Sequence, residues 1–146
     1  MTGMPPSPFV PLPEHSVRSD GTKNRLIEGD NLAVMRALIP SHAGRIKLAY
    51  IDPPYNTGNA FTYADKRGDE WVEMMRPRLK VARELLAENG AIVVHIDEHE
   101  VARLTVLLDT IFGRENRLGT IVWDKGNPKG DSNAIAVQHE SIVAFA

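Results

Sequence analysis

Short apolar runs alternate along this chain with longer segments in which apolar residues recur every three or four positions. Runs of the first kind are typical of buried strands, and segments of the second kind are typical of helices that cover a sheet. Three helices are predicted between the first four strands. The strands are predicted at residues 23–28, 45–51, 91–96, 118–125 and 138–146.

Residues that cap helix ends mark the first and third of these helices. Asp30 has the residue type and position of an N-cap, and Pro40 is expected to close the helix that follows it. Asp97 and Glu100 are spaced as a capping box ahead of the third helix, which Gly113 is expected to end. Both helices therefore start directly after a predicted strand.

The second helix is predicted to start at Asp69 and to carry one apolar face that includes Trp71. Pro77 lies inside this helix, so we expect a kink there. Asn89–Gly90 is predicted as its left-handed C-cap. The Trp, Met and Leu residues along the apolar face are interpreted as core.

The order of these elements predicts an α/β fold. The last two strands are joined by a loop rather than a helix, so they should pair antiparallel. Residues 1–22 are rich in proline and are predicted to form an extended arm without regular structure. The sheet-forming part of the chain is then residues 23–146.

Composition narrows the functional classes. The 146 residues include no cysteine, which excludes thiol catalysis and Cys-ligated zinc in this chain. The net charge of −2 is mildly unfavourable for DNA, whose partners usually present a basic face. No stretch resembles a signal peptide or has the length of a transmembrane span, so we expect a cytoplasmic protein without membrane attachment.

The second predicted strand ends abruptly in Asp52, Pro53, Pro54 and Tyr55. Two successive prolines stop the strand and remove two N–H donors, so a carboxylate and backbone carbonyls remain as acceptors beside one aromatic ring. This surface complements an exocyclic amino group, which offers two N–H donors on a flat ring. Two acceptors could draw the amine nitrogen toward tetrahedral geometry and aim its lone pair at an electrophile.

A base that is paired inside a duplex cannot reach such a corner, so the target would be single-stranded or flipped out. Tyr55 would stack on that base, an interaction worth about 1–3 kcal/mol in nucleic-acid sites. A structural alternative stays open for the same residues, namely a proline-rich end of a strand with a capping tyrosine.

Asp-Pro-Pro-Tyr after an apolar strand resembles the signature of DNA amino-methyltransferases, which move a methyl group from S-adenosylmethionine to adenine N6 or cytosine N4. The runs 25–32 and 47–58, and later segments through His139–Glu140, are similar to the modification subunits of type III restriction-modification systems. The resemblance implies a β-group adenine-specific enzyme. It also implies part of a Rossmann-like, mostly parallel sheet in which the catalytic half precedes the cofactor half, a permuted motif order.

The resemblance assigns roles to single residues. It makes the corner from Asp52 to Tyr55 catalytic and assigns contacts with the cofactor S-adenosylmethionine to Asp30, Asp52 and Asp97. Asp30 would contact the adenosine part of the cofactor, and the same residue could also cap its helix. Asp97 would lie near the active pocket.

Five residues are predicted to face DNA: Asn56, Phe61, Tyr63, Lys125 and Lys129. The first three follow the corner, in a segment that borders the flipped base and the DNA backbone in this family. The lysines are candidate phosphate contacts in the loop between the last two strands. Phe61 and Tyr63 could instead anchor a long loop, and solvated loop lysines are common.

His95, Asp97 and His99 alternate along the chain in a spacing that could be drawn as a metal site. Asp97 is better explained as a helix cap, and a triad on one face would require the strand to continue through the start of the helix. We therefore predict no metal here.

Two parts of the resembled family are absent from the sequence: the Phe-x-Gly-x-Gly turn that binds the methionine part of the cofactor, and a target recognition region. We expect adenine-N6 methylation of double-stranded DNA only with a second methyltransferase subunit or a complementing C-terminal part. A restriction subunit is a further expected partner. An exposed sheet edge is also expected, and it would favour association.

Three alternatives remain open at this stage. The corner could serve cytosine N4, or the planar amide of a glutamine side chain. The chain could also be a non-catalytic remnant or a partner-dependent subunit without activity of its own.

Overall fold

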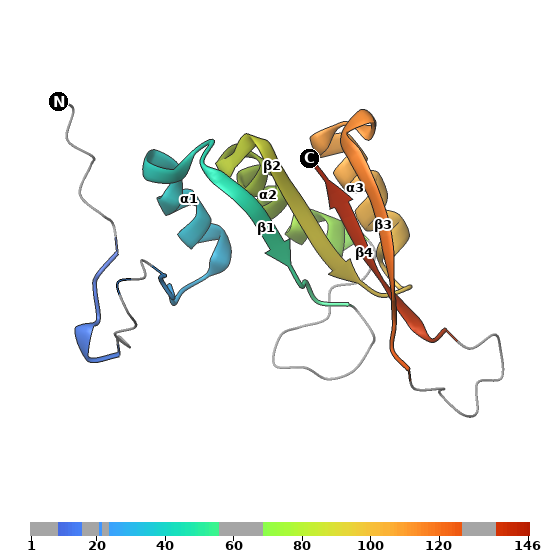
Figure 1. Ribbon diagram of the computed structural model, residues 1–146, viewed down its shortest axis with the longest axis horizontal. Coiled ribbons are helices and arrows are strands. Elements are labelled where there is room, and N and C mark those ends of the chain that lie inside the picture. The colour runs from blue at the N-terminus through green and yellow to red at the C-terminus, as the bar shows by residue number, and fades with distance from the viewer. Residues whose placement is uncertain (1–8, 16–20, 22–23, 56–68, 127–136) are drawn as a thin grey trace.

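The computed structural model describes residues 9–15, 21, 24–55, 69–126 and 137–146 (Figure 1). These residues form a four-stranded sheet that carries its helices on one side. The strands are β1 (Ile46–Ile51), β2 (Leu86–Ile96), β3 (Arg117–Asp124) and β4 (His139–Phe145). The helices are α1 (Asn31–His42), α2 (Asp69–Leu85) and α3 (Val101–Phe112), with two short 3-10 helices, η1 (Pro13–His15) and η2 (Arg114–Asn116).

The strands lie in the order β1-β2-β4-β3. β1 and β2 are parallel, with Ile51 level with Val94. β4 runs antiparallel to β2, with Ile142 opposite His95, and antiparallel to β3 on its other side. The predicted α/β class and the antiparallel pairing of the last two strands are confirmed. In the described sheet β4 lies between β2 and β3, so β2 has one parallel and one antiparallel neighbour.

One face of the sheet is covered by α2 and α3, and α1 packs against α2 (Figure 1). Alternate residues of the strands and every third or fourth residue of the helices enter this core, as the two periodicities require. None of the described helices is long and apolar enough to cross a bilayer. The fully buried core side chains include Trp71, Met75, Leu79, Ile92, Val94, Ile96, Leu104, Leu108, Val143 and Phe145.

The opposite face of the sheet, here called the open face, is not covered by any helix of the described residues. Leu48 and Tyr50 point to it, because the residues alternating with them in β1 pack against the core. Ile121 and Trp123 of β3 lie on the same face, opposite Ile142 and Glu140 of β4. Tyr50 is 58% exposed and Trp123 is 56% exposed. Large apolar side chains therefore remain in contact with solvent on this side.

The predicted strand at residues 23–28 is not formed. Residues 24–28 have no regular structure, and Leu26 is fully exposed. A strand needs a neighbour that accepts and donates its backbone hydrogen bonds. In the described sheet residues 24–28 have no such neighbour, because they do not pair with the free edge of the outer strand β1.

Two predicted helix boundaries are wrong by several residues. α1 continues through Pro40 to His42, because a proline in the last turn removes one backbone hydrogen bond while the bond that closes the helix, from Ala43 N to Ile39 O at 3.0 Å, still forms. α3 begins at Val101 rather than at Asp97, after a turn over the intervening residues. The ends predicted at Asp30 and Gly113 are confirmed.

The predicted C-cap at Asn89–Gly90 is also wrong. α2 runs through Pro77 and ends at Leu85, and Asn89 and Gly90 belong to β2, within an irregular part of its pairing with β1. A Cβ atom at Gly90 would lie 2.7 Å from the carbonyl oxygen of Ile46. Glycine is therefore required by a close approach of two strands and not by a left-handed turn.

The predicted N-terminal arm contains one regular element among its described residues, the 3-10 helix η1. This differs from the prediction that proline prevents any regular structure there. Pro13 is the first residue of η1, a position where a missing N–H costs nothing and the fixed φ of proline suits a helical turn.

Candidate functional site

The corner from Asp52 to Tyr55 directly follows β1, at the edge of the sheet where the parallel strands β1 and β2 have their carboxyl ends. Asp52 is exposed, Pro53 is buried, and Pro54 and Tyr55 are half-buried. Ligands of α/β folds bind at this edge of the sheet. The sequence motif thus presents a carboxylate to solvent and does not lie within the packed core.

The corner is attached to α2 through Trp71. The indole Nε1 of Trp71 donates a hydrogen bond to the carbonyl oxygen of Pro54 at 2.8 Å, and the Trp71 side chain is fully buried. The sequence predicted Trp71 only as a core residue. In the structure it also fixes the backbone of the candidate site and satisfies its own buried N–H group.

Tyr55 turns its hydroxyl group toward Asp52. The hydroxyl donates a hydrogen bond to the Asp52 carboxylate. Burial is the largest cause that raises the pKa of Tyr55 well above its ordinary value, followed by the hydrogen bond and the negative charge of Asp52; Glu140 and Tyr50 add to the effect. Tyr55 is therefore harder to ionise than an ordinary tyrosine.

Asp30 is confirmed as the N-cap of α1. Its Oδ1 accepts a hydrogen bond from the backbone N–H of Ala33 at 3.0 Å, and its Oδ2 lies 3.6 Å from Nη2 of Arg78. Arg78 also donates from Nε to Oδ1 of Asn31 at 2.8 Å, which ties the start of α1 to α2. The Asp30 side chain stays largely exposed, so its carboxylate can take a further partner.

Asp97 is buried and bound to the turn that it precedes. Its Oδ1 accepts from the backbone N–H of His99 at 3.0 Å, and its Oδ2 lies 2.8 Å from Nδ1 of the same residue. The predicted cap of the third helix at Asp97 is therefore wrong, because Asp97 caps a turn that lies ahead of α3. The assigned N-cap of α3 is Glu100, which pairs with Arg103 at 3.2 Å instead of forming a capping box with Asp97.

The three alternating residues considered as metal ligands do not meet at one point. His95 contacts Tyr50 and Glu140, whereas Asp97 contacts His99. Asp97, Glu98 and His99 do place possible ligand atoms within 4.8 Å of one another. The contacts of Asp97 with His99 account for this grouping as a capped turn.

Of the five residues predicted to face DNA, only Lys125 lies within the described part of the chain; Asn56, Phe61, Tyr63 and Lys129 lie outside it. Lys125 Nζ is 3.0 Å from Oε1 of Glu140, and the lysine side chain is half-buried. Its charge is therefore already balanced by a neighbouring strand in this structure.

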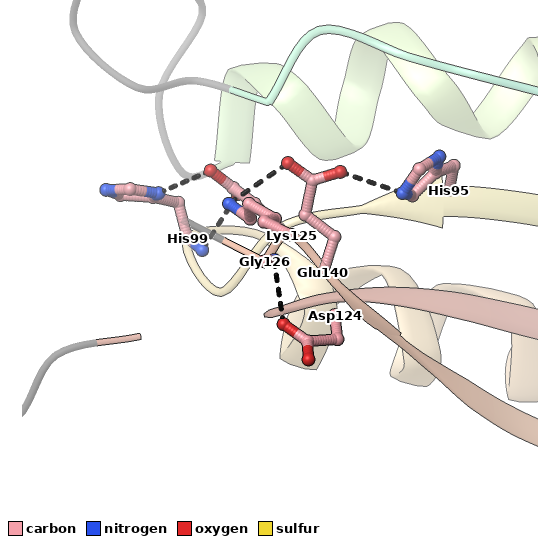
Figure 2. Close-up of polar contacts among 7 residues, drawn as sticks. His95, His99, Asp124, Lys125, Gly126 and Glu140 are labelled. Carbon is pink, nitrogen blue, oxygen red and sulfur yellow. Dashed lines mark hydrogen bonds and ion pairs between the residues drawn. The ribbon is translucent and has the colours of Figure 1, made fainter. Parts of the chain in front are cut away.

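Sequence reasoning missed a row of polar side chains that crosses the open face beside the corner. We call Tyr50, His95, Glu140 and Lys125 the polar array. Figure 2 shows Glu140 directed to His95 with one carboxylate oxygen and to Lys125 with the other. The available signal was the presence of His95 in the apolar run 91–96 and of Glu140 in the last predicted strand.

The described acidic residues differ in how well they suit S-adenosylmethionine, a sulfonium that also carries an ammonium group and ribose hydroxyls. Asp30 and Asp52 fit such groups, because both carboxylates are exposed and accept hydrogen bonds. Asp97 fits less well, since the carboxylate is buried and both of its oxygens contact His99.

Comparison with known proteins gives one family. The family described as DNA methylase matches residues 46–146. The chain is 33% identical to the EcoP15I Mod subunit, a type III restriction-modification enzyme of Escherichia coli, over 99% of this chain and 28% of that protein. It is 37% identical to the type II methyltransferase M.KpnI of Klebsiella pneumoniae, over 86% of this chain and 33% of that protein.

A third relative is the probable type III HindVI Mod subunit of Haemophilus influenzae, 46% identical over 70% of this chain and 14% of that protein. The chain thus spans a third or less of the curated relatives named here.

Two solved structures share the fold. TTHA0409 of Thermus thermophilus matches 80% of this chain and 50% of its own, with a TM-score of 0.55 and 19% identity. The complex of M1.HpyAVI with SAM matches 81% of this chain and 52% of its own, with a TM-score of 0.53 and 15% identity. At these identities the likeness concerns the fold alone.

Proposed function

Since the chain belongs to the DNA methylase family, we propose that it is the amino-group-binding part of a DNA methyltransferase that acts on adenine N6. The observation that carries this proposal is the exposed Asp52 carboxylate at the carboxyl end of β1, next to the buried Pro53 and the half-buried Tyr55. A carboxylate and a backbone carbonyl at such a corner are two acceptors for the two N–H groups of one amine.

The hydrogen bonds of the corner favour one backbone carbonyl as the proposed second acceptor. The carbonyl oxygen of Pro54 already accepts from Trp71. The Pro53 carbonyl is therefore the preferred partner, together with the Asp52 carboxylate, for the amino group of a flipped adenine. Held between these acceptors, the amine nitrogen directs its lone pair away from the ring and toward the methyl donor.

Tyr55 would hold the plane of the base and the position of the carboxylate at the same time. Its ring is half-buried against the core, and its exposed part would stack on the adenine, while its hydroxyl interacts with Asp52. Tyr55 carries its proton at neutral pH, as an ordinary tyrosine does, and its raised pKa extends the protonated form to higher pH. Asp52 keeps further lone pairs for the amino group, since a carboxylate accepts several hydrogen bonds.

The proposed cofactor is S-adenosylmethionine, which supplies an electrophilic methyl group when bound. Asp30 is the residue we assign to its adenosine part, and the negative charge of Asp52 suits its sulfonium. Asp97 is proposed only as a residue near the pocket, because its carboxylate is engaged with His99.

Adenine is favoured over cytosine by the residue type at position 52, since aspartate there resembles the adenine-specific members of the family. Cytosine N4 is the alternative substrate. The absence of a Phe-x-Gly-x-Gly turn in the sequence supports the view that transfer requires a complementing methyltransferase part. Similarity to Mod subunits of restriction-modification enzymes supports DNA and a restriction subunit as partners. Double-stranded DNA as the form of the substrate and the cytoplasm as the location are part of the same proposal.

The test is methyl transfer from labelled S-adenosylmethionine to unmethylated DNA, with the methylated base identified by mass spectrometry. The chain is assayed alone and in place of the matching segment of the EcoP15I Mod subunit. We expect N6-methyladenine from the joined protein and none from the chain alone.

Each other outcome contradicts a defined part of the proposal. N4-methylcytosine would establish the alternative substrate, and transfer by the isolated chain would refute the need for a complementing part. A folded joined protein that methylates no DNA would contradict the proposed function itself.

A further inference from the structure

The polar array links all four strands of the described sheet. The hydroxyl of Tyr50 in β1 lies 3.2 Å from Nδ1 of His95 in β2. Nε2 of His95 is buried and lies 2.8 Å from Oε2 of Glu140 in β4, a close polar contact whose angles do not meet hydrogen-bond geometry. Oε1 of Glu140 lies 3.0 Å from Nζ of Lys125, which follows the last residue of β3 (Figure 2). Glu140 is therefore the centre of the array, with one partner on each carboxylate oxygen.

Lys125 is held in place by its backbone as well as by its charge. Its N–H donates to the carbonyl oxygen of Gln138 at 2.9 Å, and the N–H of Gly126 donates to Oδ1 of Asp124 at 2.9 Å. The backbone of Lys125 is thus held in place next to the beginning of β4. This placement favours the role of Lys125 as a structural counter-ion for Glu140 over a role as a phosphate contact.

The array is not explained by the stability of the sheet. The His95 side chain is 16% exposed and the Glu140 side chain 19% exposed, so both polar groups are largely removed from water. Burial of an ion pair is weak support for stability, because apolar residues of similar size usually serve at least as well. Other residues of β2 and β4 are apolar at equivalent positions, which shows that this sheet accommodates them.

The array lies against the candidate active site. The ring of His95 is 6.0 Å from the ring of Tyr55, centroid to centroid, with the planes tilted by 55°. On its other side His95 meets the ring of Trp123 at 6.5 Å. If the pairing of β1 with β2 is continued by one residue beyond Ile51 and Val94, Asp52 lies level with His95.

We propose that Glu140 is a positioning residue for the corner: it holds His95 with one oxygen and Lys125 with the other, and thereby fixes the surface on which the Tyr55 ring rests. The functional consequence rests on the proposed function, in which Tyr55 stacks on the target base. Glu140 acts through His95 and does not touch the substrate. A residue 85 positions after Tyr55 in the sequence thus sets the orientation of the aromatic ring in the Asp-Pro-Pro-Tyr motif.

The first test reads the Tyr55 ring directly and needs no enzymatic activity. The chain has three tyrosines, so ring-labelled tyrosine gives three sets of ¹³C signals, which Tyr→Phe variants assign. We expect Glu140→Ala to shift the Tyr55 and Tyr50 signals. Glu140→Gln, which keeps an oxygen for His95, and Lys125→Met should give smaller shifts in the same direction.

Glu84→Ala is the matched control, because Glu84 is an exposed acidic residue of α2. If Glu140 only ties the strands together, its variants unfold at lower denaturant concentration but leave the Tyr55 signal of the folded chain in place. The proposal is overturned if the signal stays at the control position in every folded variant among the three.

The second test uses the joined protein described above. Glu140→Ala should lower kcat for methyl transfer by on the order of 10- to 100-fold, the penalty for a misplaced contact, with KM for S-adenosylmethionine unchanged. Glu140→Gln should restore part of the rate. Failure of the joined protein to methylate DNA would contradict the proposed function and leave the NMR result to decide the role of Glu140.

Discussion

The hydroxyl of Tyr55 and the carboxylate of Asp52 form a donor–acceptor pair in which the tyrosine keeps its proton. Burial and the charge of Asp52 both oppose a phenolate at this position. The pair therefore behaves as a neutral ring attached to an anionic acceptor throughout the physiological pH range. Such a pair can bind the N–H groups of a base and cannot itself remove a proton as a phenolate would.

This pair predicts the ionisation behaviour of the tyrosines. Tyrosines ordinarily ionise at about pH 10. In a spectrophotometric titration of the folded chain, Tyr55→Phe should reduce the absorbance change of tyrosine ionisation only at higher pH than this. Asp52→Asn should bring that ionisation to lower pH, because it removes the charge that opposes the phenolate. Loss of amplitude within the ordinary range in Tyr55→Phe would contradict the burial and the hydrogen bond.

The raised pKa of Tyr55 also determines how the free energy of unfolding changes with pH. The folded chain holds the Tyr55 proton more tightly than the unfolded chain does. The resulting contribution to the free energy of unfolding is fully present below the unfolded pKa and is lost as pH rises through the folded pKa.

At the residue scale, the sequence identified contacts that lie close together in the chain and missed those between distant segments. The corner is a run of four successive residues, so its chemistry could be predicted from local properties. Tyr50 and His95 are 45 residues apart, and their contact depends on the pairing of β1 with β2. Without that register, the sequence presents His95 only as a candidate metal ligand and Glu140 only as part of a motif.

Trp71 connects the corner to α2. The side chain is fully buried in the core, and its indole donates to the Pro54 carbonyl. The same residue thus connects the packing of α2 with the backbone of the candidate site. The geometry of the corner depends on a helix as well as on the strand that precedes it.

This connection predicts a stability cost for Trp71→Phe. The substitution removes the N–H donor and leaves the Pro54 carbonyl without its partner, which should lower the free energy of unfolding by about 1–3 kcal/mol. Urea denaturation measures it, with Trp123→Phe as the control at an exposed position, where a change within about 0.5 kcal/mol is expected. Equal effects of the two substitutions would contradict the anchoring role of Trp71.

At the element scale, the errors of prediction share one cause, namely that tertiary contacts decided where an element forms or ends. Gly90 resembled a helix cap, yet it is required by the approach of the Ile46 carbonyl from the neighbouring strand. Residues 24–28 have the apolar pattern of a strand but lack a neighbour in the described sheet. The spacing of apolar residues along the chain did predict the helices and strands of the core, because in these elements the buried side chains recur with the period of the helix or the strand.

The described sheet is covered on one face and bounded by two outer strands, β1 and β3. The exposed edge expected from the sequence corresponds to β1. β3 is exposed over most of its length and includes Ile121, Val122 and Trp123. An outer strand with large apolar side chains offers unpaired backbone groups and apolar surface to another chain.

The chain on its own should therefore self-associate as its concentration rises. Ile121→Lys places a charge on the exposed strand β3 and should shift the transition to dimers or larger species toward higher concentration. Light scattering after size-exclusion chromatography measures it. Val106→Lys, at an exposed apolar position of α3, is the control and should leave association unchanged; equal effects of both would show that association does not use the sheet.

The most direct measurement of the role of the corner is methyl transfer to DNA by the joined protein with Asp52→Ala, compared with Glu84→Ala. We expect N6-methyladenine formation to be lost or severely reduced in Asp52→Ala and in Tyr55→Ala, while Glu84→Ala retains the rate of the unsubstituted protein. A folded Asp52→Ala protein that methylates adenine at the unsubstituted rate would contradict the claim that this carboxylate holds the amino group of the base.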